Sequence, residues 1–235
     1  MTRWLTRLGL AAIIALLAPA LSPAPSASGG LEAVVQDDRG KPIADVVVSL
    51  TPPGPAPGPR PAPAVIDQQN KAFVPQILAV HVGTSVAFPN RDNIRHHVYS
   101  FSSAKRFELP LYIGTPAAPV VFDKPGVVVL GCNIHDWMVG YVYVLATPYF
   151  AKTAGDGKAR LADVLPGAYE ARVWHPRMKG DPEKTGKPIT IAAGDPGQVA
   201  FVVALKPEPR VPQRPPYESG PQSRVHDRPL KVGPL

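Results

Sequence analysis

Short runs of β-branched and aromatic residues, bounded by turn residues, recur along most of this chain and limit what it can fold into. Val, Ile, Tyr and Phe favour strands, whereas Gly, Pro, Asn and Asp supply the backbone angles that turns require. No segment after the N-terminal region shows the sustained 3.6-residue apolar repeat of an amphipathic helix. We therefore predict an all-β protein. The clearest predicted strands cover residues 31–35, 45–50, 77–82, 85–88, 127–130, 141–145, 169–174 and 198–205.

The N-terminal residues have the order of an export signal. Arg3 and Arg7 precede an apolar run over residues 8–17, and small residues follow it. Prolines interrupt the region soon afterwards, whereas a membrane-spanning helix needs about 20 continuous apolar residues. We expect residues 1–28 to be a cleaved signal peptide, which places the mature protein in the periplasm without a membrane span.

The net charge gives no indication of a nucleic-acid partner. Lys and Arg outnumber Asp and Glu by seven, but Arg3 and Arg7 belong to the expected signal peptide. The region from Lys206 onward carries a further excess of three positive charges. The remaining body is near +2, so we expect no nucleic-acid binding.

Proline-rich stretches divide the chain into segments. Seven prolines lie between positions 52 and 63 and eight between 207 and 234, so we predict a linker at 55–65 and a disordered tail at 206–235. The strand spacing favours two small β-sandwiches, one at 66–146 and one split between 29–54 and 147–205. A single elaborated sandwich stays open as an alternative, because short strands do not by themselves count domains.

The split unit resembles the carboxypeptidase regulatory-like, or transthyretin-like, β-sandwich. Residues 40–48 carry the resemblance on one side, with a Gly-Lys-Pro turn before a run of three valines. Residues 159–169 carry it on the other, where a Leu-Pro-Gly turn precedes Tyr169. The resemblance implies that the two parts close around the unit inserted between them.

Cys132 is the only cysteine of the chain, so no intramolecular disulfide can form. Exported proteins normally use cysteines in pairs. The lone thiol is therefore an intermolecular disulfide partner, a nucleophile, an inert core residue or a metal ligand. Haem attachment would need a second cysteine, and no oxyanion-hole or triad pattern accompanies Cys132. We expect no enzymatic activity.

Cys132 begins a Cys-x-x-His-x-x-Met motif that directly follows a buried-type strand. Taken singly, Cys132, His135 and Met138 are each better explained as core or surface residues. Together, a thiolate, an imidazole and a thioether suit copper in both oxidation states, whereas zinc usually takes four Cys or His ligands. A second imidazole is still needed, and His96 and His97 follow an earlier predicted strand.

Two segments resemble the cupredoxins, the family of small blue copper proteins, and the amicyanin-type members in particular. Residues 73–90 are similar to the first strands of such a protein, and residues 123–132 to the strand that delivers the cysteine ligand. The loop after Cys132 also has the amicyanin-type length. The resemblance covers residues 66–146 and implies a Greek-key β-sandwich with one type 1 copper ion.

The resemblance also implies the ligand set. The step of six residues from Asn90 selects His96 as the second imidazole, and Met138 becomes the weak axial ligand beside Cys132 and His135. Copper in such a site is held by two imidazoles and a thiolate in one plane.

Three further residues are placed beside the ligands by the same resemblance. The side-chain amide of Asn90 would tie the two ligand-bearing loops together. His97 occupies the position where an Asn usually follows the first ligand, and Arg95 stands where a Pro is common. A positive charge at Arg95 would favour Cu(I) if its side chain points toward the metal.

The expected function is single-electron transfer between redox partners. By resemblance, His135 is the ligand nearest the surface, and Ile94, Ile134, Trp137 and Val139 would form an apolar patch for transient docking. The partner is expected to be a redox protein, a cytochrome or a dehydrogenase, which nothing in the chain identifies. The alternative is a copper-binding, trafficking or cell-envelope interaction module that uses the same ligands without an electron-transfer role.

Overall fold

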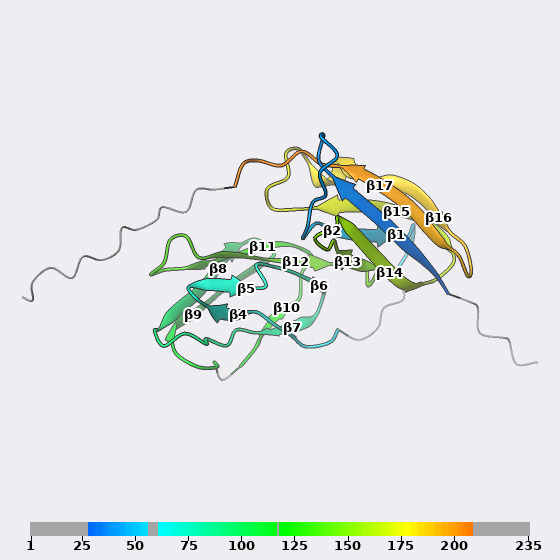
Figure 1. Cartoon of the computed structure of the whole chain (residues 1–235). Helices are drawn as coiled ribbons and strands as arrows, with labels where there is room; N and C mark the ends of the chain where they lie inside the picture. Colours follow the sequence, from blue (N-terminus) through cyan, green and yellow to red (C-terminus); the bar gives the residue numbers. More distant parts are fainter. Residues whose placement is uncertain (1–27, 56–60, 117, 209–235) are drawn as a thin grey trace, which may run out of the picture.

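The computed structural model describes residues 28–55, 61–116 and 118–208, which form β-strands joined by turns (Figure 1). The all-β class is confirmed, and each strand expected from the sequence is present. A single 3₁₀ turn, η1 (Pro182–Thr185), is the only helical element of the described residues. None of their helices could span a membrane. Residues 1–27 of the expected signal peptide, 56–60 of the linker and 209–235 of the tail lie outside the described residues.

Strands from both ends of the described chain build one β-sandwich (Figure 1). Its sheets have the strand orders β14-β1-β17 and β13-β2-β15-β16. Burial alternates along β1, where Leu31, Ala33 and Val35 face a core shared with the opposite sheet, as expected for a strand with one covered face. The strands are β1 (Gly29–Gln36), β2 (Val47–Thr51), β13 (Phe150–Lys152), β14 (Lys158–Val164), β15 (Gly167–Trp174), β16 (Lys187–Ile191) and β17 (Pro196–Val202).

The middle of the chain builds a second group of strands around its own core. A five-stranded sheet of order β6-β12-β11-β8-β9 and a three-stranded sheet of order β10-β7-β3 contribute buried residues such as Val98, Leu130 and Phe122 to this core. A β4-β5 hairpin joins the group through a bridge from Gln68 to Asn90. The strands are β3 (Ala64–Val65), β4 (Asp67–Gln69), β5 (Ala72–Val74), β6 (Ile77–His81), β7 (Thr84–Ala87), β8 (His96–Ser102), β9 (Lys105–Tyr112), β10 (Val120–Phe122), β11 (Gly126–Cys132) and β12 (Val139–Leu145).

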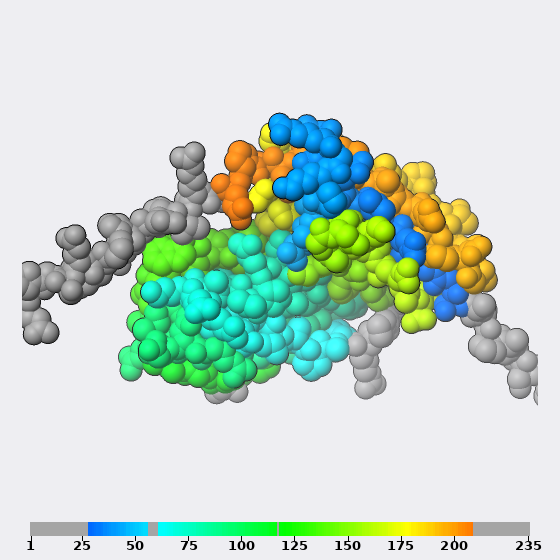
Figure 2. All heavy atoms as spheres, viewed as in Figure 1, coloured from blue at the N-terminus to red at the C-terminus, as the bar shows by residue number. Residues whose placement is uncertain are grey.

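The two groups of strands contact each other through a small apolar cluster, and Figure 2 shows them packed side by side. Val47 and Trp174 come from the first group, and Ile77 and Leu145 come from the second. The Trp174 ring lies 4.7 Å from the ring of Tyr143, measured between centroids. The described chain therefore buries two separate cores and a third apolar contact between them.

Candidate metal centre

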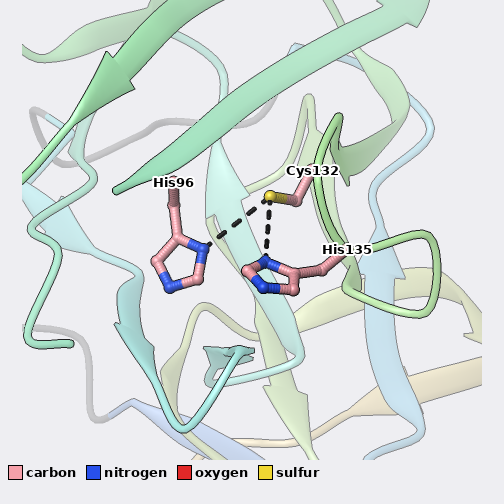
Figure 3. A group of neighbouring side chains, drawn as sticks. All are labelled: His96, Cys132 and His135. Atoms are coloured by element: carbon pink, nitrogen blue, oxygen red, sulfur yellow. Dashed lines mark hydrogen bonds between the residues drawn. The ribbon is translucent and has the colours of Figure 1, made fainter. Parts of the chain in front are cut away.

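Three donor atoms from separate parts of the middle group meet at one end of the five-stranded sheet (Figure 3). The Sγ atom of Cys132 lies 3.8 Å from Nδ1 of His96 and 3.7 Å from Nδ1 of His135. All three donor atoms lie within 4.8 Å of one another. Within the described residues this is the only such group of three His, Cys, Asp or Glu side chains.

The strand pattern explains why His96 and Cys132 meet. Neighbouring strands β8 and β11 are antiparallel, and Cys132, the last residue of β11, pairs with Val98. His96 lies two residues before Val98, so the side chains of His96 and Val98 point to the same, buried face of β8. Cys132, as the partner of Val98, lies on that face as well. A register irregularity between His96 and Val98 marks the point where β8 begins.

His135 and Met138 lie in the loop that joins β11 to β12. The backbone N–H of Met138 donates a 2.9 Å hydrogen bond to the carbonyl of His135, which closes a tight turn. The Met138 side chain is 1 % exposed and belongs to the same core cluster as Cys132. The turn thus places His135 beside Cys132, while the Met138 side chain is buried in the core.

Burial differs among the three donors. His96 is completely buried and Cys132 is 3 % exposed, whereas His135 is half-buried. Burial, followed by the nearby charges of His96 and Lys71, lowers the pKa of His135. A lowered pKa favours the neutral imidazole, which is the form that binds metal ions.

Asp92 contacts the far side of the His96 ring and was not identified from the sequence. Its Oδ2 atom lies 2.7 Å from Nε2 of His96, and its carboxylate also accepts hydrogen bonds from the backbone N–H groups of Asn70 and Lys71. Burial acts to raise the pKa of Asp92, but these hydrogen bonds outweigh it and the pKa is lowered. The available signal was a carboxylate four residues before a candidate ligand, which is weak without the hairpin contacts.

The Asn90 side chain makes hydrogen bonds that differ from the expected tie between the two ligand-bearing loops. Its side-chain amide donates to the carbonyls of Ile94 and Tyr112, both at 2.8 Å, and its Oδ1 atom accepts from the backbone N–H of Asp92. These bonds brace the loop before His96 and attach it to β9. The expected tie to the second ligand-bearing loop is not among them, because the amide faces the end of β9.

His97 lies outside the donor cluster, as the alternation of a strand requires. Its Nε2 atom is 2.9 Å from Oε1 of Glu108 on β9, and its ring meets the Tyr99 ring edge-on at 5.9 Å. Arg95, just before His96, is exposed. The structure therefore brings His96, and not His97, to Cys132.

A buried polar pair lies in the core below the loop that precedes His96. Gln68 is completely buried and donates from Nε2 to the Tyr112 hydroxyl at 2.5 Å and to the carbonyl of Phe88 at 3.2 Å. Burial, together with the charge of Cys132, raises the pKa of Tyr112 to about 12. Tyr112 therefore stays a neutral hydrogen-bonding residue at physiological pH.

An exposed aromatic ring lies against His135, and other apolar residues are near it in the sequence. Trp137 is 38 % exposed and its ring lies 5.3 Å from the His135 ring, and Ile134 is 46 % exposed. Ile94 and Val139, the other two members of the expected patch, are half-buried. An aromatic ring thus lies directly against the most accessible of the three donors.

The donors present fit a metal ion of intermediate softness. A thiol and two imidazoles are the ligand types of copper and zinc sites, and the bond to Asp92 leaves Nδ1 of His96 free to bind. Met138, which is buried in the same core cluster as Cys132, offers a thioether as a further candidate ligand.

Comparisons with known proteins gave matches among solved structures. No family model and no curated protein matches the sequence. A copper-containing nitrite reductase (NirK) from Thermus scotoductus SA-01 is 25 % identical, with a TM-score of 0.34 over 48 % of this chain. The match spans only 28 % of the reductase chain.

Two smaller structures are matched over nearly their whole length. A purple cupredoxin from Nitrosopumilus maritimus is 27 % identical, with a TM-score of 0.31 over 36 % of this chain and 100 % of its own. A reduced mutant of amicyanin is 23 % identical, with a TM-score of 0.32 over 41 % of this chain and 99 % of its own.

Proposed function

We propose that this chain binds one copper ion as a type 1 centre and carries single electrons. The observation that carries the proposal is the convergence of Cys132 Sγ with the Nδ1 atoms of His96 and His135 at 3.8 and 3.7 Å. These three atoms would form the plane of ligands, and the Met138 thioether would be the weak axial ligand.

The donor set favours copper over zinc. Structural zinc sites usually take four Cys or His ligands, and a thioether is a poor replacement for one of them. A thiolate, imidazoles and a weak thioether together suit copper in both oxidation states. Copper would supply a reversible one-electron couple, and the residues of this chain would bind it, exclude water and keep the ligands in place.

Electron transfer, rather than catalysis, agrees with the burial of the site. His96 and Cys132 are enclosed by the core, and four protein donors would leave no position for a substrate. His135 is the accessible ligand, and Trp137 and Ile134 offer an apolar surface beside it. We propose that a redox protein, a cytochrome or a dehydrogenase, docks there transiently.

We further propose that the protein acts in the periplasm. The support is the signal-like order of residues 1–28. No basic surface of the size needed for nucleic acid is expected from the charge of the body.

Visible absorption of the purified protein after addition of Cu(II) tests the proposal. We expect an intense charge-transfer band from the Cys132 thiolate, reversible one-electron reduction, and loss of the band in Cys132→Ser. A colourless Cu(II) complex with an ordinary tetragonal spectrum would contradict the type 1 assignment. Binding of Cu(I) alone, with rapid exchange to a chelator, would instead support the trafficking alternative.

A further inference from the structure

We propose that Asp92 is a positioning residue of this centre. Anchored to the tip of the β4–β5 hairpin, it fixes the His96 ring with Nδ1 toward Cys132 and holds a negative charge behind the imidazole. The effect on bound copper rests on the proposed function. The effect on the ring orientation applies to the metal-free protein as well.

Both nitrogens of the His96 ring are accounted for. Nε2 lies 2.7 Å from Oδ2 of Asp92, and Nδ1 lies 3.8 Å from Sγ of Cys132. Because His96 is completely buried, a rotated ring would leave a polar nitrogen without a partner or water. A buried polar group without a partner is unfavourable, because its hydrogen bonds to water are lost and not replaced. Asp92 therefore selects one ring orientation and one tautomer, with the proton on Nε2.

Two backbone hydrogen bonds hold the Asp92 carboxylate itself in place. Oδ1 accepts a 2.7 Å hydrogen bond from the backbone N–H of Asn70, and Oδ2 accepts a 2.9 Å bond from that of Lys71. The Asp92 side chain is only 15 % exposed. Two backbone N–H groups thus fix the carboxylate, and Oδ2 keeps a further lone pair that can accept a hydrogen bond from the His96 ring.

The backbone conformation of the hairpin tip allows both N–H groups to reach Asp92. Gln69 and Ala72 are paired, and the two residues between them, Asn70 and Lys71, have φ angles of 53° and 58°. Two left-handed residues form the two-residue turn that best matches the twist of a hairpin. Asn tolerates this conformation, whereas it is uncommon for Lys. The hydrogen bond from the Lys71 backbone N–H to Asp92 helps to offset its cost.

A negative charge at this place should favour the more highly charged metal state. A carboxylate hydrogen-bonded to a ligating imidazole makes the imidazole a stronger donor and stabilises Cu(II) relative to Cu(I). Removing the charge should therefore weaken Cu(II) binding and raise the reduction potential.

The neighbouring residue provides a matched control. His97 also lies beside a carboxylate, with Nε2 2.9 Å from Oε1 of Glu108, but on the outer face of the sheet. The Glu108 side chain is 64 % exposed. Glu108→Gln thus removes a carboxylate charge beside the neighbouring histidine without touching His96.

Nitrogen NMR of the metal-free protein labelled in its histidines tests the ring orientation. In the wild type, we expect His96 to carry its proton on Nε2 alone. In Asp92→Asn, the amide NH₂ competes with the imidazole as a donor, so the single Nε2–H tautomer should be lost. In Glu108→Gln it should persist.

Copper titration and voltammetry test the effect on the metal. Asp92→Asn should raise the dissociation constant for Cu(II) by about 10–100-fold, the usual effect of removing a partner of a metal ligand, and should raise the reduction potential. Glu108→Gln should leave both close to the wild-type values.

Two results would overturn the inference. One is an Nδ1–H tautomer of His96 in the metal-free wild type, which needs no variant and therefore decides even if Asp92→Asn fails to fold. The other is a folded Asp92→Asn protein with wild-type tautomer, affinity and potential. A wild type that keeps Nε2–H in the metal-free state but gives a colourless copper complex would overturn the proposed function and support the positioning role of Asp92.

Discussion

Two adjacent histidines of β8 have opposite environments, and this difference defines the site at the scale of single residues. His96 is enclosed between Cys132 and Asp92, whereas His97 faces Glu108 on the outer side of the sheet. The sequence alone left both residues open as ligands until the resemblance to cupredoxins selected His96. Strand alternation then makes the choice exclusive, since neighbours in a strand cannot share a face.

Replacing each histidine by alanine should separate their roles. His96→Ala should lose the charge-transfer band, because it removes one of three converging donors. His97→Ala should keep the band with a small change in potential. Visible and electron paramagnetic resonance spectra of the copper-loaded variants check this, and a band lost only in His97→Ala would contradict the assignment.

Met138 should control the reduction potential more than the affinity for copper. In the proposed centre three stronger donors would hold the ion, and a weak thioether would donate mainly to Cu(II). Met138→Leu keeps the side chain apolar and of similar volume at a site that is 1 % exposed. We expect copper to stay bound and the potential to rise, as measured by voltammetry. An unchanged potential would remove Met138 from the ligand set.

At the scale of elements, the end of β11 depends on a glycine. Gly131, the residue before Cys132, pairs with Tyr99 on β8, and the Tyr99 ring fills the space where a side chain would lie. A Cβ at Gly131 would be 2.7 Å from Cζ of Tyr99, which is closer than real contacts of this kind. The ring thus packs on the backbone next to the cysteine donor.

Gly131→Ala should therefore destabilise the protein by about 1–3 kcal/mol, the usual range for overpacking. Gly155→Ala is the control, because a Cβ at Gly155 would meet no atom within 4 Å. Urea unfolding of the metal-free proteins measures the difference. Equal midpoints would mean that the Tyr99 ring moves aside without loss of stability.

The elements also show how far the sequence could lead. The buried run before Cys132 and the Cys-x-x-His-x-x-Met spacing were sufficient to predict β11 and three candidate ligands. Strand β9 was not predicted, because its half-buried pattern mixes charged residues and a proline with apolar ones. The contact of Asp92 with the hairpin tip could not be predicted either, since the partners are backbone N–H groups of Asn70 and Lys71, which any residue except proline provides.

At the scale of the whole molecule, Trp174 is the aromatic member of the apolar cluster between the two groups of strands. It is 7 % exposed and lies against Tyr141 and Tyr143 of β12, the strand that follows the ligand loop. Sequence patterns could predict strands on both sides of this contact. They could not predict the contact itself. The sequence pattern around a buried tryptophan is the same whether the ring packs in its own core or against a neighbouring one.

Trp174→Ala should lower the free energy of unfolding by about 3–5 kcal/mol, as for other buried large-to-small changes. Phe101→Ala is the control, because Phe101 is 71 % exposed and a surface change usually stays within about 0.5 kcal/mol. Thermal and chemical unfolding followed by tryptophan-independent circular dichroism check both. A loss no larger than that of Phe101→Ala would mean that the two groups are stable without this contact.

The parallel pairing of β1 with β17 has a mechanical consequence. The first and last described strands lie side by side from Gly30 with Pro196 to Gln36 with Val202. A pull on the two ends of the described chain acts at opposite ends of this pair, so its hydrogen bonds bear the load together rather than one after another. The segment with the metal centre leaves from β2 and returns at β13, which are also neighbours in one sheet. Tension along the chain should therefore be carried by the β1–β17 pair. The three donors of the candidate metal centre should bear no load until that pair separates.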